Sequence, residues 1–229
     1  MPSYTTKRFL PIAGWILIAI TGLYITSITV SHYFNFTRES FTDYFWPRRY
    51  WLIIHITGGI TALLVGQFQF FKKLRVRRIK LHRMLGRIYL TSILISAPIG
   101  LYLALTSNIN FVYATGLSLL AITWFSTATM GYISIRKGNI IQHREWMIRS
   151  YVVTSAFLFF RIGAKLLEGM DVGPFEMRFA LLSWACWSIP LFISEIFLQA
   201  GKIRNVKQTT MPKTKIESKM ESLDMSLLK

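Results

Sequence analysis

The sequence predicts an all-α integral membrane protein, a bundle of six transmembrane helices. The chain is 52% hydrophobic and has a mean hydropathy of +0.40, which is unusual for a soluble domain. It also contains apolar runs of about 20 residues, the length a helix needs to cross roughly 30 Å of hydrocarbon. A bilayer core holds no water for backbone polar groups, so these runs must be helical. They lie near 9–31, 51–71, 87–106, 111–135, 147–167 and 177–199.

The ends of the chain differ in character. The run 9–31 lacks an A-x-A-like cleavage site and is longer than the apolar core of a signal peptide, so we interpret it as a retained span. Residues 1–200 then form one six-helix transmembrane domain. Residues 201–229 are polar, lysine-rich and poor in aromatics, and we expect them to form a basic, disordered cytoplasmic tail.

The net charge of +17 is distributed unevenly. The segment from Lys72 to Arg87 holds eight Lys or Arg residues and no acid, whereas the connections near 107–110 and 168–176 carry no Lys or Arg. This alternation follows the positive-inside rule and predicts that both termini are cytoplasmic, although the first outer loop, 32–50, is mixed. Anionic lipid headgroups are the expected partners of the basic loops. Nucleic acid is not expected, because aromatic residues do not interleave with the basic run.

One face of the second span combines a histidine with small residues. His55, Gly59, Ala62, Gly66 and Gln69 follow helical spacing and share this face. Small residues let helices pack closely in lipid, and a histidine can then form a hydrogen bond across the contact. Alternatively, the strip leaves room for a flat ligand beside the imidazole. An ionisable group within a span tends to face a bundle interior, a cavity or a cofactor.

Two further spans carry polar residues on one face. On the third span these are His82, Gly86, Tyr89 and Ser96. On the fifth span they are His143, Ser150, Thr154 and Arg161. Arg161 lies about 21 Å along from the cytoplasmic end and His55 about 6 Å in from the outer end, so the two have similar depth. We therefore expect His55 and Arg161 to face a shared polar interior near the outer leaflet.

The histidines can be grouped into two levels. His82 and His143 are expected at the cytoplasmic level, and His32 and His55 toward the outer side. A transmembrane di-haem cytochrome requires such an arrangement, because each iron takes two axial imidazoles from facing helices. The alternative is that His82 and His143 contact lipid phosphate at the headgroup level. Arginines near them are candidates to hold haem propionates by charge-assisted bonds: Arg83, Arg87, Arg144 and Arg149.

A weak internal repeat accompanies this pattern. The segments 81–89 and 142–151 both read His-Arg followed by Arg-x-Tyr, and both stand at the cytoplasmic start of a span. They indicate either parallel hairpin repeats or ordinary interfacial anchors. The sequence contains no G-x-S-x-G, no H-E-x-x-H and no glycine-rich phosphate loop, so no hydrolase is predicted and no catalytic residue is assigned.

The ordered set of motifs resembles a known family. These motifs are His55 with Gly58-Gly59, Gly66-Gln67-Phe68-Gln69-Phe70, Leu81-His82-Arg83 with Gly86-Arg87-Ile88-Tyr89, His143 to Tyr151, and Arg161. The series, over roughly 50–165, resembles the bacterial membrane-protein family called domain of unknown function 2306. The resemblance implies a bacterial cytoplasmic (inner) membrane location and no particular activity. A weaker likeness, through Leu81-His82 with Gly86, is to six-span b-type cytochromes that reduce or oxidise ascorbate.

Three functional hypotheses follow. The first is membrane electron transfer, an oxidoreductase-type carrier with haem b or a quinone in the bundle interior. The second is a transporter, or a lipid- or small-molecule-binding protein, that uses His55 and Arg161. The third is a structural or regulatory membrane component. The candidate haem ligands are His55, His82 and His143. The candidate cofactor-binding residues are these three with Arg83, Arg87, Arg144, Arg149, Arg161, Gln69 and Tyr89.

Overall fold

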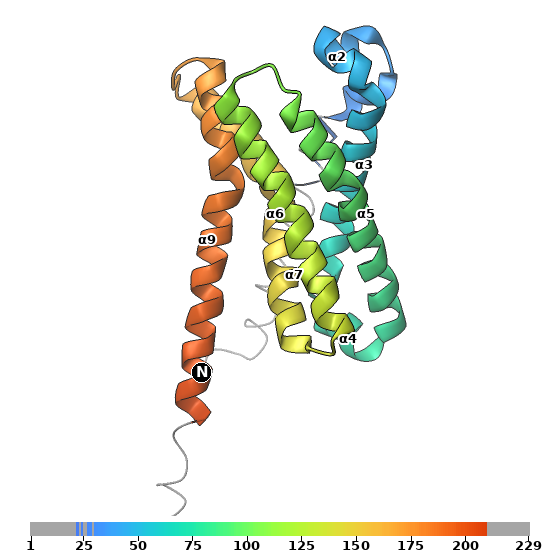
Figure 1. The fold of residues 1–229 in the computed structure, drawn as a ribbon, viewed down its shortest axis with the longest axis vertical. Helices are drawn as coiled ribbons and strands as arrows, with labels where there is room; N and C mark the ends of the chain where they lie inside the picture. The colour runs from blue at the N-terminus through green and yellow to red at the C-terminus, as the bar shows by residue number, and fades with distance from the viewer. Residues whose placement is uncertain (1–21, 23, 25–26, 29, 210–229) are drawn as a thin grey trace, which may run out of the picture. The chain divides into compact units, whose positions relative to one another are not determined.

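A computed structural model describes residues 22, 24, 27–28 and 30–209 of the chain (Figure 1). The predicted first span, 9–31, lies outside the described residues except for a few positions at its end. The chain divides into two compact units whose boundary falls between Leu191 and Phe192. The elements are η1 (Ser31–Asn35), α2 (Arg38–Phe45), η2 (Trp46–Arg48), α3 (Arg49–Phe68), α4 (Lys72–Arg77), α5 (Ile79–Leu105), α6 (Phe111–Arg136), α7 (Ile140–Thr154), α8 (Ala156–Gly169) and α9 (Phe175–Thr209).

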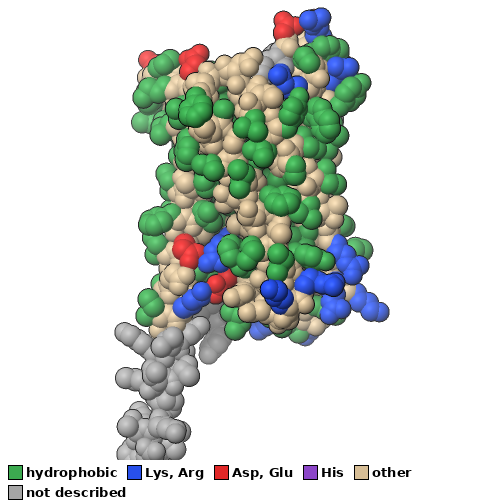
Figure 2. Space-filling model, in the orientation of Figure 1, with side chains coloured by type: hydrophobic (Ala, Val, Ile, Leu, Met, Phe, Trp, Pro, Cys, Tyr) green, Lys and Arg blue, Asp and Glu red, His purple; other side chains and the backbone are tan. Residues whose placement is uncertain are grey.

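Five helical stretches of the described residues are long and apolar enough to cross a membrane. They are Trp46–Phe68, Ile79–Leu105, Phe111–Arg136, Ile140–Gly169 and Phe175–Ile203. Five of the six predicted spans are therefore confirmed as helices. Hydrophobic side chains are spread over the face of the molecule that Figure 2 shows, and large apolar side chains such as Leu105 (67%) and Phe111 (81%) are exposed. Because water would penalise such a surface, it fits contact with lipid.

The structure corrects three predicted boundaries. The third span begins at Ile79 and not at 87, since the basic turn before Arg87 is already helical. The predicted span 147–167 is part of two helices that meet at Ser155. There the Ser155 hydroxyl donates to Tyr151 O (2.9 Å), a carbonyl of the preceding turn, which bends helices in membranes. The tail predicted from residue 201 is helical up to Thr209, and 210–229 lie outside the described residues.

Local sequence explains where two of the helices begin. Asn110 precedes α6, and its side chain accepts a hydrogen bond from Tyr113 N at 2.8 Å. Asn139 precedes α7 and accepts from Gln142 N at 3.0 Å. Both are N-caps, which satisfy backbone donors left free at a helix start. Gly138 allows the tight turn between α6 and α7, because its φ of 75° is accessible to glycine at little cost.

Four helices form the centre of the first unit. α3 packs against α5, α5 against α6 and α6 against α7, and α3 also contacts α7. Figure 1 shows consecutive helices running in opposite directions, with α4 and the α6–α7 connection at the same end. The basic residues of the α3–α5 connection gather there (Figure 2). The core comprises Ala62, Tyr89, Ile93, Ala97, Trp124, Ala128, Met147, Tyr151 and Val153.

A buried hydrogen-bond cluster joins three of these helices. The Thr154 hydroxyl of α7 donates to Ser150 O at 2.8 Å, so its oxygen is left to accept. It accepts from Trp124 Nε1 of α6 at 2.8 Å and from the Tyr89 hydroxyl of α5 at 3.0 Å. Tyr89 in turn accepts from Ser150 Oγ at 2.8 Å. Every hydroxyl of the cluster is therefore satisfied inside the protein, as the membrane interior requires.

The fourth helix joins through two tyrosines that occupy equivalent places in the sequence repeat. The Tyr151 hydroxyl of α7 donates to Leu63 O of α3 at 3.2 Å. The rings of Tyr89 and Tyr151 both lie against Gly66, where an added Cβ would come within 2.6 Å of one ring and 2.7 Å of the other. The absence of a side chain at Gly66 therefore lets α3 approach both helices closely.

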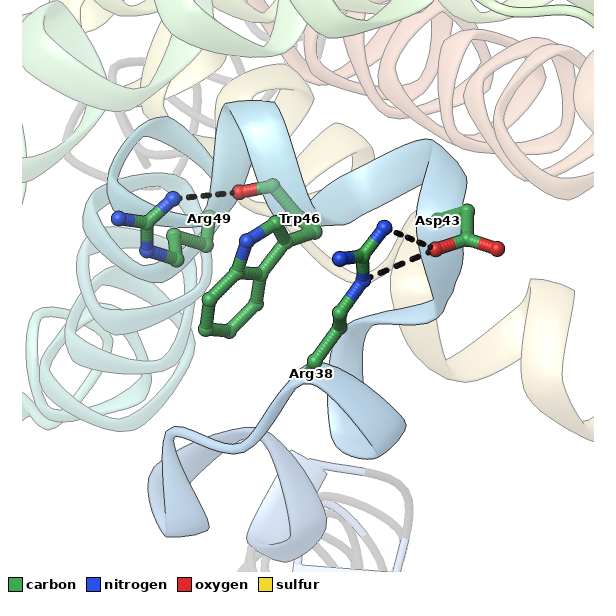
Figure 3. A network of polar contacts seen from close by, with 4 residues as sticks. All are labelled: Arg38, Asp43, Trp46 and Arg49. Carbon is green, nitrogen blue, oxygen red and sulfur yellow. Dashed lines mark hydrogen bonds and ion pairs between the residues drawn. The ribbon is translucent and has the colours of Figure 1, made fainter.

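The segment before α3 lies at the end of the bundle opposite α4 (Figure 1), and Figure 3 shows its polar contacts. The Arg49 guanidinium donates to Trp46 O at 2.8 Å and lies 4.4 Å from the centroid of the Trp46 ring. Arg38 pairs with Asp43 at 2.9 Å, but both side chains are largely exposed, so this pair contributes little stability. Stacked Arg and Trp side chains are typical of the boundary between a membrane and water.

We expect Gly66→Ala to lower the midpoint of thermal unfolding in detergent, because the added methyl group must displace two packed rings, at a cost of about 1–3 kcal/mol. Unfolding can be followed by thiol labelling, since Cys186 is the only cysteine of the sequence and is buried. Gly59→Ala on the same helix is the matched control, because a Cβ there meets no atom within 4 Å. Equal midpoints for the two variants would contradict the close packing at Gly66.

Thr154→Val is expected to lower the same midpoint. The change leaves Trp124 Nε1 without its acceptor and weakens the hold on Tyr89, and a buried unsatisfied donor costs about 1–3 kcal/mol. Thr127→Val serves as the control, because the Thr127 hydroxyl bonds only to carbonyls of its own helix. A Thr154 variant as stable as the Thr127 variant would show that the cluster does not hold the helices together.

Candidate functional site

A cavity of about 780 Å³ lies in the half of the first unit that is nearer the α5–α6 connection. This volume is within the usual range for small-molecule sites. Residues of α3, α5, α6, α7, α8 and the first turns of α9 line it, and most are aliphatic or aromatic. They include Leu52, Ile60, Leu103, Leu120, Phe157 and Phe160. The cavity is thus an apolar chamber inside the helix bundle.

A small number of polar side chains interrupt this apolar lining. His55 of α3 and Arg161 of α8 both line the cavity, so the structure places in one chamber the two residues expected to share an interior. The chamber is less polar than the sequence predicted, because aliphatic and aromatic walls separate its polar groups. The other polar lining residues include Tyr33, Ser107, Asn108, Tyr113, Thr154 and Glu176.

The imidazole of His55 is held in one orientation. Its Nδ1 lies 2.9 Å from Ser96 O, and because a carbonyl oxygen can only accept, Nδ1 is the donor. In the neutral ring, Nε2 is then an acceptor. An added Cβ at Gly100 would lie 2.7 Å from Cε1 of the ring, and the Trp124 ring packs edge-on at 6.3 Å between centroids. The fold therefore supplies a histidine with a defined tautomer at the cavity wall.

The guanidinium of Arg161 has aromatic neighbours. It lies 5.4 Å from the centroid of the Phe157 ring and within electrostatic reach of Tyr113. Burial raises the pKa of the Tyr33 hydroxyl, and the nearby positive charge of Arg161 opposes this rise. Among the described residues, no carboxylate lies within ion-pair distance of Arg161. Glu176 lines the same cavity but is not paired with it.

The small-residue face of α3 serves both purposes that its sequence left open. His55 and Gly59 line the cavity. Ala62 and Gly66, further along the same face, are buried in the packed core. Gln69 ends the face and is also buried. Close packing therefore occupies the half near Gln69, and open space occupies the half near His55.

The opposite end of the bundle holds the other two candidate histidines with described side chains. With its amide nitrogen toward α5, Gln69 donates to His82 Nδ1 at 2.8 Å and to His82 O at 3.2 Å. This makes Nδ1 of a neutral His82 an acceptor, so its Nε2 carries the proton. His143 Nδ1 donates to Gly131 O at 2.8 Å. His82 lies within electrostatic reach of His143. This agrees with the prediction that both histidines lie at the same level of the bundle.

The four candidate arginines and Tyr89 do not line the cavity. Arg83, Arg87 and Arg144 are exposed. Arg149 lies 3.8 Å from Glu145 and 4.8 Å from the centroid of the Trp146 ring. Tyr89 is fully buried, and its hydroxyl belongs to the core hydrogen-bond cluster described above. A role for these residues in binding a cofactor stays a prediction.

The structure separates His55 from the other candidate haem ligands. His55 and Gln69, which contacts His82, stand fourteen positions apart on α3, or about 21 Å along the helix axis. Within the part of the chain that is described, His55 is the only histidine that lines the cavity. The side chain of His32 lies outside the described residues. A second axial imidazole at the cavity is therefore not among the described side chains.

The sequence did not single out several residues that shape the cavity. Trp124 packs against His55, Gly100 makes room for the ring, and Tyr33 and Tyr113 lie within electrostatic reach of Arg161. Trp124 stands in an apolar run that has no histidine or charge, and Tyr33 lies outside every predicted span. Only the pairing of helices brings them to the site.

The comparisons with known proteins agree with this membrane architecture. Neither the curated proteins nor the solved structures include a match. The profile of one family, described as predicted membrane protein (DUF2306), matches residues 52–198, which include all the candidate site residues. The chain therefore belongs to the DUF2306 family of predicted membrane proteins.

Proposed function

We propose that this membrane protein binds an amphipathic small molecule, with an anionic head group and an apolar body, in the cavity between α3 and α8. The observation that carries the proposal is Arg161, a cation on the wall of a largely apolar chamber that has no carboxylate partner among the described residues. An uncompensated charge in a low-dielectric site is costly. An anionic ligand group would offset that cost.

The distribution of polar residues in the cavity would orient such a ligand. Arg161, Tyr33 and Tyr113 form a group at one side of the chamber, and this group would bind the head. Val153 lies eight residues before Arg161, about 12 Å along the helices, and also lines the cavity. Between these levels the walls are aliphatic and aromatic, so they would contact an apolar body. His55 would accept a hydrogen bond from a hydroxyl of the ligand through Nε2.

Electron transfer is the second candidate, because the free Nε2 of His55 can accept a hydrogen bond from a quinol or bind the iron of haem b. A quinol hydroxyl would donate to His55 Nε2, and the oxidised carbonyl would accept from Arg161. A haem with two axial imidazoles would need a second histidine, and no other described histidine side chain lines the cavity. Transport of the bound molecule and a structural or regulatory role stay hypotheses that rest on the sequence alone.

For the orientation, we infer a bacterial cytoplasmic membrane with both termini in the cytoplasm. The basic α3–α5 connection and the α6–α7 connection lie at the same end of the first unit, and positive loops favour the cytoplasm. The cavity would then lie toward the outer leaflet.

Binding can be tested with a fluorescent long-chain fatty acid and the full chain in detergent micelles. Loss of a charge-assisted hydrogen bond costs about 1.5–3 kcal/mol, so Arg161→Gln is expected to weaken binding by about 10-fold or more. Lys165→Gln is the matched control, because Lys165 is exposed one turn further along α8 and is not part of the cavity lining. Equal affinities for the two variants would refute the site.

The electron-transfer candidate has its own readout. If the ligand is a quinol, an organic extract of the purified protein should contain a quinone, and His55→Ala should reduce its amount relative to folded protein, because the quinol loses its acceptor at Nε2. A Soret band that shifts on reduction with dithionite would instead indicate haem. A preparation with neither signal, which still binds the fatty acid, would exclude this candidate.

The orientation predicts the reactivity of introduced cysteines in intact cells. An impermeant maleimide should label Asp171→Cys, in the α8–α9 connection, without permeabilisation. It should label Lys137→Cys, after α6, only once the membrane is opened. Cys186 is buried and gives little background. If only Lys137→Cys were labelled in intact cells, the proposed orientation would be wrong and both termini would be outside the cytoplasm.

A further inference from the structure

A second hollow lies on the outer surface of the bundle, along the seam between α3 and α5. This groove has a volume of about 560 Å³ and is lined on one side by Ile53, Ile54, Thr57, Gly58 and Thr61 and on the other by Arg87, Ile88, Thr91, Ser92, Ile95 and Ser96. Gly58 lies where the two helices touch, because an added Cβ there would collide with the Ser96 side chain. Both helices are membrane-spanning candidates, so the groove faces lipid.

Arg87 stands at one end of this groove. It lies eighteen residues before the end of α5 at Leu105, or about 27 Å along the axis, close to the roughly 30 Å thickness of the hydrocarbon core. The guanidinium is therefore at the level where lipid phosphates begin. The described residues supply it with neither a hydrogen bond nor an ion pair. It also belongs to the run from Lys72 to Arg87, which has eight cations and no acid.

The groove changes character along its length. Thr91 lies one turn from Arg87, and its hydroxyl has no hydrogen-bond partner among the described residues. Beyond it, Ile95 is 51% exposed and Ile54 43% exposed, and both form an apolar channel. Arg87 and Ile95 are about 12 Å apart along α5. Along the groove a cation is followed by a free hydroxyl and then by an apolar channel. This order matches that of the phosphate, the ester carbonyl and the acyl chain in a phospholipid.

We propose that the α3–α5 groove is a binding site for one anionic phospholipid, with the phosphate at Arg87, an ester carbonyl at Thr91 and one acyl chain along Ile54 and Ile95. Arg87 thus has a function separate from the cavity, since it does not line that chamber. Small and hydroxylated side chains also favour contact between transmembrane helices. The position of Arg87 and the purely cationic surroundings favour the lipid, because a second copy would bring the same positive charge to the seam.

Native mass spectrometry of the full chain in detergent, with added phosphatidylglycerol or phosphatidylcholine, tests the proposal. The wild-type protein should retain one phosphatidylglycerol in preference to phosphatidylcholine. Arg87→Gln should weaken the retained binding by about tenfold. Arg83→Gln, one turn earlier on the exposed surface of α5 and outside the groove, should leave it unchanged. Equal losses in both variants would mean diffuse attraction to the basic end and would overturn the site.

Two further variants test the shape of the groove and the competing occupant. Ile95→Trp fills the apolar channel and should also abolish selective retention, whereas Leu94→Trp, exposed on the same helix but outside the groove, should not. Thr57→Cys should stay monomeric under oxidation in membranes. Efficient formation of a disulfide-linked dimer through this cysteine would overturn the proposal in favour of a second copy of the chain. The Cys186 labelling assay confirms that the arginine and tryptophan variants are folded, and size-exclusion chromatography of the reduced protein does so for Thr57→Cys.

Discussion

Hydrogen bonding inside a medium without water is the constraint on which the rest of this structure depends. A buried polar side chain is costly to leave without a partner where no water can supply one, and Tyr89, Ser150, Thr154 and Trp124 find partners in one another. Their bonds join α5, α6 and α7, and Tyr151 extends the connection to α3. This cluster, with the close contact at Gly66, fixes the spacing of four helices in one half of the bundle.

The cavity is the counterpart of this tight packing. Beyond the cluster the same helices, with α8 and α9, line a cavity of about 780 Å³. Trp124 marks the boundary, because its indole nitrogen donates into the cluster while its ring packs against His55 at the cavity wall. The orientation of His55 therefore depends on the same core that holds the helices together. A change at Thr154 should consequently affect both the stability of the bundle and the chemistry of the chamber.

Charge is used differently in three places. At the basic end, several arginines are exposed, and the structure gives Arg87 a groove beside it. In the cavity, Arg161 is surrounded by aromatic side chains without a carboxylate partner among the described residues, so a ligand would complete its environment. Before α3, Arg49 stacks on Trp46 and binds its carbonyl (Figure 3). The first two are candidates for recognition, and the third anchors the chain at the membrane boundary.

The sequence by itself determined the membrane class, the five described spans and the face of α3 that carries His55 and Gly66, because length, apolarity and helical spacing depend only on local order. It also placed His55 and Arg161 at similar depth, since the rise of a helix is constant. Tertiary structure decided the rest. Whether a small residue faces a neighbour or a void, as at Gly66 and Gly59, depends on what the other helices present. The partners of Tyr89, the contact of Trp124 with His55, and the groove at Arg87 likewise arise only when α3, α5, α6 and α7 pair, because hydrogen bonds and cavities join residues far apart in the chain.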